Sequence, residues 1–333
     1  MKKHDTALFV MMIYGTTLLI WLCTNFYGKT DVYADMRQPV MQRPETAPAA
    51  AVITETESES TTVSEITSAA VPKKPRGAIP AFLEDYVIGV TAAEMPVYFN
   101  TEALKAQAVA ARTYAYREYL ADPNVCLNTI GQAYLSREEL RTRWGGEYDK
   151  NLSKIKGAVE ATAGEVIMYG GEPILAAFCS ASGGTTEQSE NVWGRPLPYL
   201  RSVSSEGDRN APVFTQTVAL SFDALAAKLG VEDASDIRVT KRSGAGYVLT
   251  AAAGGRTFSG DDIRRALSLR SSDFYIGISD SGAELTVYGY GHGVGMSQYG
   301  AEFMAQNGSG YRDILNHYYT DVQIEKLDIS HGK

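Results

Sequence analysis

One carboxylate, Glu94, lies among small residues just before a run of strong helix formers. That run carries Lys105 and Arg112 seven positions apart, close to two helical turns, so both cations lie on one face. Tyr116 follows one turn later. An acid beside a cationic, aromatic helix face is typical of a site that protonates a polar substrate and binds it. The alternative is a structural ion pair.

The elements around Glu94 can be predicted from local signals. A short helix or strand over residues 81–91 leads to it. Because Pro96 biases the preceding residue toward an extended conformation, we expect Glu94 to lie on a turn. Asn100 or Thr101 can cap the alanine-rich helix that follows, whose helix propensity is high.

The rest of the chain mixes helical and strand patterns without regular βαβ alternation. The pattern predicts an α+β fold in a single mixed globular domain over residues 79–328. Helices are expected over 137–144, 151–162, 222–229 and 260–267. Strands are expected over 165–169 and 172–179, as a hairpin around Gly170 and Gly171, and over 237–241, 247–252 and 285–290.

The amino-terminal region predicts a membrane protein. An uncharged apolar run covers residues 7–23 behind Lys2 and Lys3, which indicates a cytoplasmic segment 1–6, a transmembrane anchor 7–27 and an exported remainder. A cleaved signal peptide is the alternative, because Val32-Tyr33-Ala34 resembles a cleavage site, although it lies far beyond the run. Residues 28–78, rich in Pro, Ser, Thr, Glu and Ala, predict a flexible, disordered linker.

Composition excludes several functions. A net charge of −8 argues against nucleic-acid binding, which demands a basic surface. Of three cysteines, Cys23 lies in the apolar run, so at most one disulfide, Cys126–Cys179, is conceivable. No H-x-x-x-H or C-x-x-C spacing occurs, and we expect neither a metal nor a cofactor.

A second informative segment has glycines at alternate positions from Gly289 to Gly295. In an extended chain one side would then carry no side chains, while Tyr290 and His292 would project from the other. The bare side suits either a closely approaching ligand or a tightly packed crossing of two chain segments. The spacing alone does not distinguish them.

A third segment follows an apolar strand with Ser180, Ser182 and a Gly-Gly turn. Its hydroxyls can hydrogen bond to a sugar, but the G-x-S-x-G pattern of a nucleophilic serine is absent, and a plain turn is the simpler interpretation. Cys179, at the end of the apolar strand, is expected to be a buried small hydrophobe.

Together these motifs resemble the SpoIID/LytB family. TAAEMP, the KAQAVAARTYA helix, the SxSGGxTE turn and GHGVGMSQYGA occur in that order across residues 79–327. The resemblance implies a lytic transglycosylase that cleaves peptidoglycan glycan strands during engulfment of the forespore, with Glu94 as catalytic acid. It places Lys105, Arg112 and Gln298 along the same cleft.

The resemblance also implies a setting. The substrate would be glycan strands stripped of stem peptides, and the partners would be a sporulation amidase and a membrane scaffold protein. The catalytic domain would lie outside the cytoplasm, on the mother-cell engulfing membrane facing the forespore. The competing hypothesis is a non-catalytic module that binds glycan and recruits or stimulates a cell-wall amidase.

One departure from the family pattern concerns zinc. Family members often carry a zinc-binding loop after the first helix, with a histidine, a cysteine and a His-Cys pair. Here Cys126 is present, but Ile130 and Gly131 stand where the His-Cys pair would be. Cys179 also stands where a histidine is common. These substitutions predict that no zinc binds.

Overall fold

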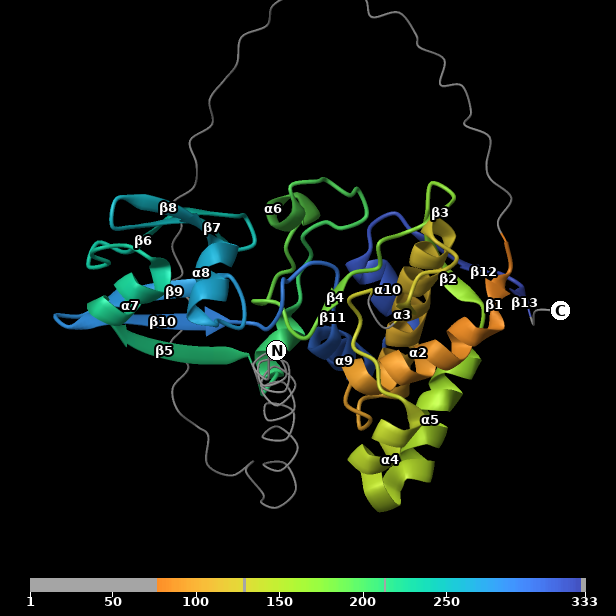
Figure 1. Ribbon diagram of the computed structural model, residues 1–333. Helices are drawn as coiled ribbons and strands as arrows, with labels where there is room; N and C mark the ends of the chain where they lie inside the picture. Colours follow the sequence, from red (N-terminus) through yellow and green to blue (C-terminus); the bar gives the residue numbers. More distant parts are fainter. Residues whose placement is uncertain (1–76, 128–129, 213, 331–333) are drawn as a thin grey trace, which may run out of the picture. The chain divides into compact units, whose positions relative to one another are not determined.

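The computed structural model describes residues 77–127, 130–212 and 214–330 (Figure 1). This part is a mixed α/β globular region, as the sequence predicts. The predicted cytoplasmic segment, the anchor and nearly all of the linker lie outside the described residues. Within them, no helix combines the length and hydropathy needed to cross a bilayer.

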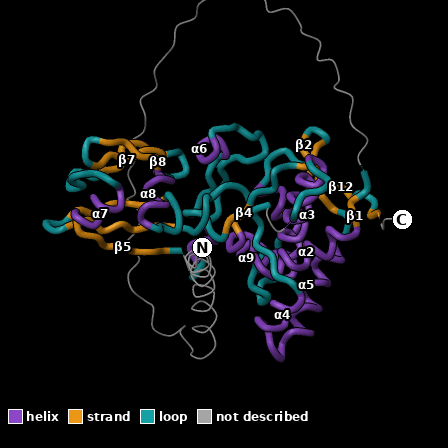
Figure 2. The backbone as a smooth tube through the Cα atoms, in the orientation of Figure 1, coloured by secondary structure: helices purple, strands orange, loops and turns teal. Residues whose placement is uncertain are grey.

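A first hydrophobic core is built around one central helix, α3 (Thr101–Ala121). It packs against α2 (Ala81–Glu94), α5 (Tyr148–Ala161), α9 (Gln298–Gln306) and α10 (Tyr311–Tyr318) (Figures 1 and 2). Half of the buried residues of α3 are alanines, so neighbouring helices can approach its backbone closely. The same core includes a three-stranded sheet of order β12-β2-β3, namely Gln323–Lys326, Glu165–Tyr169 and Glu172–Pro173.

A second hydrophobic core lies within residues 215–288. Its first sheet is antiparallel with order β5-β10-β9, made of Thr215–Ser221, Gly282–Tyr288 and Asp273–Ile278. Its second has order β6-β7-β8, made of Arg238–Arg242, Val248–Ala253 and Arg256–Ser259. Helices α7 (Phe222–Leu229) and α8 (Gly260–Leu267) contribute Leu225, Leu229 and Ile263 to this core.

Short elements complete the described region. Strand β1 (Ile79–Pro80) pairs in parallel with β13 (Ile329–Ser330), and β4 (Phe178–Cys179) with β11 (Met296–Ser297). Helix α4 (Arg137–Trp144) precedes α5 through the 3₁₀ turn η3 (Gly145–Glu147). Helix α6 (Ser189–Trp193) and the 3₁₀ helix η4 (Glu206–Asn210) lie between β4 and β5 in the chain.

The local signals predicted many elements correctly. The bounds of α4, α7 and α8 agree with the predicted ranges, and Asn100 caps α3 by accepting a hydrogen bond from Glu102 N. The 170–171 hairpin is present, although its second strand ends at Pro173. The prediction that Glu94 lies on a turn was wrong. Pro96 constrains only Met95, which is extended, so α2 continues through Glu94.

Candidate active site

Glu94 is the last residue of α2, and its carboxylate is held by two neutral donors. The backbone N–H of Ala133 donates to Oε1 over 2.7 Å, and the Gln298 side chain approaches Oε2 at 3.5 Å. Gln298 begins α9, where Ser297 caps the helix, and is 5% exposed. Glu94 itself is partly exposed. The structure therefore brings together two predicted site residues that are 204 positions apart.

Gln107 of α3 extends this group into the interior. Its Oε1 accepts from Gln298 Nε2 over 3.4 Å, and its side chain is fully buried. Gln107 Nε2 has no hydrogen-bond partner within the described residues. Nearby, Gln132 accepts from the Tyr86 hydroxyl over 3.3 Å and donates to the α3 backbone. Three glutamine side chains thus lie at or near Glu94.

Burial controls the charge of Glu94. Desolvation raises the pKa of its carboxyl group above the ordinary value, and the hydrogen bonds from Ala133 and Gln298 oppose that rise without cancelling it. Burial and the nearby Glu94 charge also raise the pKa of Tyr86. The Tyr86 ring stacks on Tyr134, with centroids 5.3 Å apart and planes 11° apart. Burial, and not the hydrogen-bond donors, thus shifts Glu94 toward its protonated form.

Lys105 does not contact Glu94 in the structure. Its Nζ pairs with Glu102 over 2.7 Å and lies 5.7 Å from the centre of the Tyr311 ring. The reason is helical geometry. Gln107, which faces the site, is two positions from Lys105, a rotation of about 200° around α3. The proposed cation face and the Glu94 site therefore lie on opposite sides of this helix.

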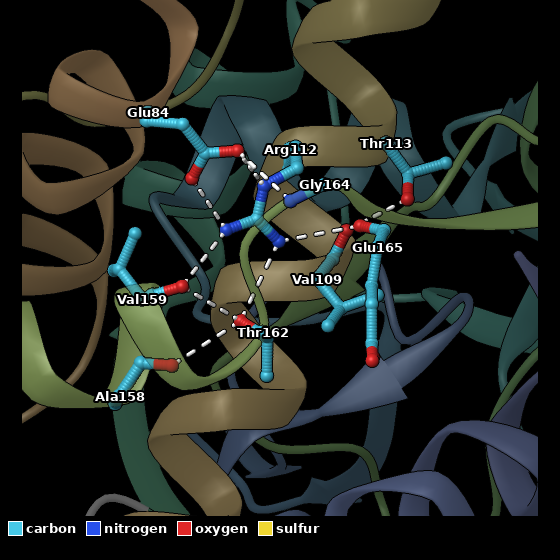
Figure 3. Close-up of polar contacts among 9 residues, drawn as sticks. All are labelled: Glu84, Val109, Arg112, Thr113, Ala158, Val159, Thr162, Gly164 and Glu165. Carbon is cyan, nitrogen blue, oxygen red and sulfur yellow. Dashed lines mark hydrogen bonds and ion pairs between the residues drawn. The ribbon is translucent and has the colours of Figure 1, made fainter. Parts of the chain in front are cut away.

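Arg112, which the sequence predicts to contact substrate, has its side chain in the core (Figure 3). Its side chain is 0% exposed and forms a bidentate ion pair with Glu84, with both N–O distances 2.8 Å. The remaining donors bind the Val159 and Glu165 carbonyls and the Thr162 hydroxyl. All five guanidinium N–H groups are thus used in joining α2, α3, α5 and β2.

Ser182 also has a structural position. It is fully buried, and both its N–H and its hydroxyl donate to Asp208 Oδ2. The other Asp208 oxygen accepts from Ser297, the cap of α9. Ser180 presents its carbonyl to Tyr299 N over 3.1 Å. These contacts support the plain-turn interpretation, in which the turn positions the start of α9 and hence Gln298.

The glycine-rich segment is a tight crossing of two chain segments. All four glycines from Gly289 to Gly295 have positive φ, so the segment is not the regular extended strand that alternation predicts. A Cβ on Gly295 would overlap the Ala177 carbonyl oxygen, and one on Gly293 would overlap the Tyr247 hydroxyl. The chain itself therefore occupies the bare side of this segment.

This crossing gives a stability prediction. Gly295→Ala is expected to unfold more readily than Gly308→Ala, by about 1–3 kcal/mol of overpacking. Both residues have positive φ, which costs an alanine about 1–2 kcal/mol. Only Gly295 faces a neighbouring atom, since nothing lies within 4 Å of a Cβ at Gly308. Equal urea midpoints for the two variants would contradict the packing argument.

Tyr290 and His292 lie at the start of this segment, away from the hydrogen bonds of Glu94. Tyr290 is 46% exposed, and its backbone pairs with Ala181. His292 Nδ1 accepts from Val294 N over 3.0 Å. Burial, together with the nearby Arg264, lowers the pKa of His292 to about 4, so the imidazole is neutral at pH 7.

The two cysteines that the structure describes belong to no metal-binding group there. Cys179 is buried and Cys126 is exposed, and no disulfide joins them. The described residues contain no group of three or more His, Cys, Asp or Glu side chains arranged to hold a metal ion. Ile130 and Gly131, which replace the family's His-Cys pair, have no side-chain donor atoms. The residues present thus do not fit the zinc loop.

Sequence reasoning missed the amide groups that surround Glu94. Gln107 interrupts a run of alanine and valine on α3, and a lone amide in such a run was the available signal. Gln132 and the Ala133 N–H offered none, because they lie in a loop. Only tertiary contact reveals that this loop reaches the end of α2.

Comparison with known proteins identifies relatives of this chain. The family model described as stage II sporulation protein matches residues 80–169, which include Glu94, Gln107 and Gln132. The chain is 42% identical over 257 residues to stage II sporulation protein D of Bacillus amyloliquefaciens and to that of Bacillus subtilis (strain 168). The alignments cover 74% of this chain and 75% of each relative. An amidase enhancer of Bacillus subtilis (strain 168) is 29% identical over 296 residues, covering 71% of this chain and 40% of that protein.

Proposed function

Because the chain belongs to the stage II sporulation protein D family, we propose that it is a lytic transglycosylase acting on peptidoglycan. It would cleave glycan strands between MurNAc and GlcNAc and leave 1,6-anhydroMurNAc ends. One observation carries the proposal. Glu94 is a partly exposed acid whose pKa is raised by burial and whose hydrogen-bond donors are neutral.

The reaction needs one group that first gives and then takes a proton. Protonated Glu94 donates its proton to the glycosidic oxygen as the bond from that oxygen to C1 of MurNAc breaks. The 6-hydroxyl of the same sugar forms the new bond to C1, and its proton passes to the Glu94 carboxylate. The acid is regenerated without water. Ordinary glycosidases use two carboxyl groups for their proton transfers and nucleophilic steps.

The surroundings of Glu94 suit both halves of this cycle. Burial favours the neutral acid that is needed first. Once the proton has left, the Ala133 N–H and the Gln298 amide can stabilise the carboxylate until it accepts the proton from the 6-hydroxyl. Lys105 and Arg112 are paired with Glu102 and Glu84, so their charges do not hold Glu94 ionised.

Product analysis tests the reaction. Purified protein is incubated with peptide-free glycan strands, and the fragments are examined by mass spectrometry. We expect fragments ending in 1,6-anhydroMurNAc. Fragments with reducing MurNAc ends would indicate hydrolysis and refute the non-hydrolytic mechanism, and intact strands would refute cleavage altogether.

The raised pKa of Glu94 predicts a pH dependence. A general acid must be protonated, so the rate is expected to fall as pH rises through the raised pKa, above the usual range of a glutamic acid.

The free energy of unfolding is expected to fall over the same pH interval. A raised folded-state pKa contributes stability that is fully present below the unfolded pKa and is lost as pH rises through the folded value. Wild type should therefore lose stability relative to Glu94→Gln over that interval. If the free energy of unfolding changed with pH equally in the two proteins, the prediction of a raised Glu94 pKa would be contradicted.

A non-catalytic role is the second candidate, favoured by the similarity to an amidase enhancer. In that case the domain would bind glycan and recruit or stimulate a cell-wall amidase, and Glu94 would only hydrogen bond to the sugar. Peptide-free strands distinguish the two functions, because they lack the bond that an amidase cuts. Binding without cleavage, together with faster amidase turnover on intact peptidoglycan, would favour the enhancer.

The setting belongs to the same proposal. Residues 7–27 would anchor the protein, and residues 28–78 would tether an extracytoplasmic domain to the mother-cell engulfing membrane. A sporulation amidase that supplies peptide-stripped strands and a membrane scaffold protein would be its partners. Fractionation of the full-length protein with protease protection checks the anchor and its orientation.

A further inference from the structure

Two exposed aromatic side chains, with half-buried cationic side chains and a histidine near them, lie around the start of the glycine-rich segment. Trp193 and Tyr290 are 42% and 46% exposed. The Trp193 ring packs edge-on against His292, with centroids 5.4 Å apart, and the Arg270 guanidinium lies 5.7 Å from the centre of the Tyr290 ring. Arg264 lies close enough to lower the pKa of His292. These five residues are called the Trp193 cluster.

The cluster has the chemistry of a carbohydrate site. The negative π-face of an exposed aromatic ring attracts the weakly positive C–H groups on one face of a sugar, and the contact buries apolar surface on both sides. His292 adds a neutral donor. Because its Nδ1 accepts the Val294 N–H, the proton lies on Nε2. The ring therefore offers an N–H to a hydroxyl or carboxylate oxygen.

The two arginines add a preference for a negatively charged sugar. Guanidinium groups bind carboxylates through paired hydrogen bonds. The chain as a whole carries a net charge of −8 and would repel a polyanionic strand, so a local pair of cations matters. Arg264 pairs with Asp261 at 3.3 Å. Arg270 donates from one terminal nitrogen to the Thr215 carbonyl over 3.5 Å, and its guanidinium lies beside the exposed Tyr290 ring, where a sugar carboxylate would be bound.

We propose that the Trp193 cluster is a second glycan-binding site that takes a muramic acid residue with a free lactyl carboxylate. Lactyl carboxylates are free only where stem peptides have been removed, so this site would select peptide-stripped strands. The identity of the strand rests on the proposed function. The site itself rests on the rings, the neutral donor and the guanidinium groups.

The glycine-rich segment links this cluster to the Glu94 site at a fixed spacing. Gln298 follows His292 by six positions, a distance of at most about 20 Å even for a fully extended chain. The segment is held to residues 177–181, because Ala181 and Tyr290 exchange backbone hydrogen bonds and Met296 N donates to Ala177 O. One strand bound at both sites would therefore be aligned on Glu94 by contacts remote from the cleaved bond.

Binding measurements in the full-length, inactive Glu94→Gln background test the proposal. The probes are peptide-free glycan strands and the same strands with their lactyl carboxylates converted to amides. Trp193→Ala and Tyr290→Ala should each raise Kd for both probes about tenfold, equivalent to 1.4 kcal/mol. Arg270→Gln should weaken binding of the carboxylate strands only.

Matched controls separate these effects from general damage. Phe82→Ala removes an exposed ring of α2, which is 53% exposed, and Arg256→Gln removes an arginine that lies over Phe258. Both should leave Kd unchanged. Arg270→Gln provides a charge-specific readout even if removal of an aromatic ring lowers Tm. Kd values for all three cluster variants equal to those of the controls would overturn the proposal.

Product analysis on the same variants, in the active background, separates the two hypotheses. Anhydro-ended products together with unchanged binding by the cluster variants would refute the second site and leave the reaction standing. Weakened binding by the cluster variants without products from wild type would refute the reaction and support the second site.

Discussion

Glu94→Gln is expected to abolish 1,6-anhydroMurNAc products while leaving glycan strands bound. Glutamine keeps the size of the side chain, and its Oε1 can still accept the Ala133 N–H, so the fold should persist. It can neither donate a proton to the glycosidic oxygen nor accept one from the 6-hydroxyl. Loss of positioned acid–base catalysis costs about 10²–10⁴ in rate, and here one residue performs both transfers. The rate of product formation and Kd for peptide-free strands are the measurements.

The control for this variant is Glu138→Gln, an exposed glutamate in the first turn of α4. It has the same change in charge and size, and it should keep the wild-type rate. Undiminished anhydro product from Glu94→Gln would remove Glu94 from the mechanism. A loss of strand binding equal to the loss of rate would instead assign Glu94 to binding, as the enhancer hypothesis requires.

Arg112→Met is expected to lower the free energy of unfolding by about 3 kcal/mol, because it breaks an ion pair whose arginine is fully buried and leaves the Glu84 carboxylate, 18% exposed, without its cation. The two backbone carbonyls and the Thr162 hydroxyl that Arg112 binds also lose a donor. Urea unfolding followed by near-ultraviolet circular dichroism gives the measurement. A double variant, Arg112→Met with Glu84→Leu, should recover part of the loss, since no buried charge is then left unpaired.

The comparison variant is Arg238→Met. Arg238 pairs with Asp236 over 3.4 Å at the surface and is 62% exposed, so its loss should cost at most about 1 kcal/mol. The experiment also decides between two roles for Arg112. A substrate contact would show unchanged unfolding with reduced kcat/KM, and that outcome would restore the prediction made from helix spacing.

Local sequence signals predicted elements better than they predicted contacts. Capping residues and helix propensity located α3, α4, α7 and α8, because these signals act within one or two turns. Their seven-residue spacing also placed Lys105 and Arg112 on one face of α3, and both residues do lie within this helix. What the face meets depends on α2, β2 and α10, which supply Glu84, Glu165 and Tyr311 from distant parts of the chain.

The glycine-rich segment shows the same difference between what local sequence predicts and what tertiary contacts decide. Alternation predicted that one side of the chain must be bare, and the close approach of residues 177–183 agrees with that. Alternation could not decide whether a ligand or another segment fills the bare side. The positive φ values at all four glycines are set by the crossing itself, and they turn the segment away from a regular strand.

The sequence by itself determined the family and the mixture of helices and strands, and it identified Glu94 as the candidate acid. Tertiary structure alone decided which groups surround that acid. Gln298 reaches Glu94 because Ser297 caps α9 beside Asp208, and Ala133 reaches it because a loop returns to the end of α2. It also decided that Arg112 stabilises the core. The physical reason is that a hydrogen bond or an ion pair depends on distance in space, and spacing along the chain fixes that distance only within a single helix or turn.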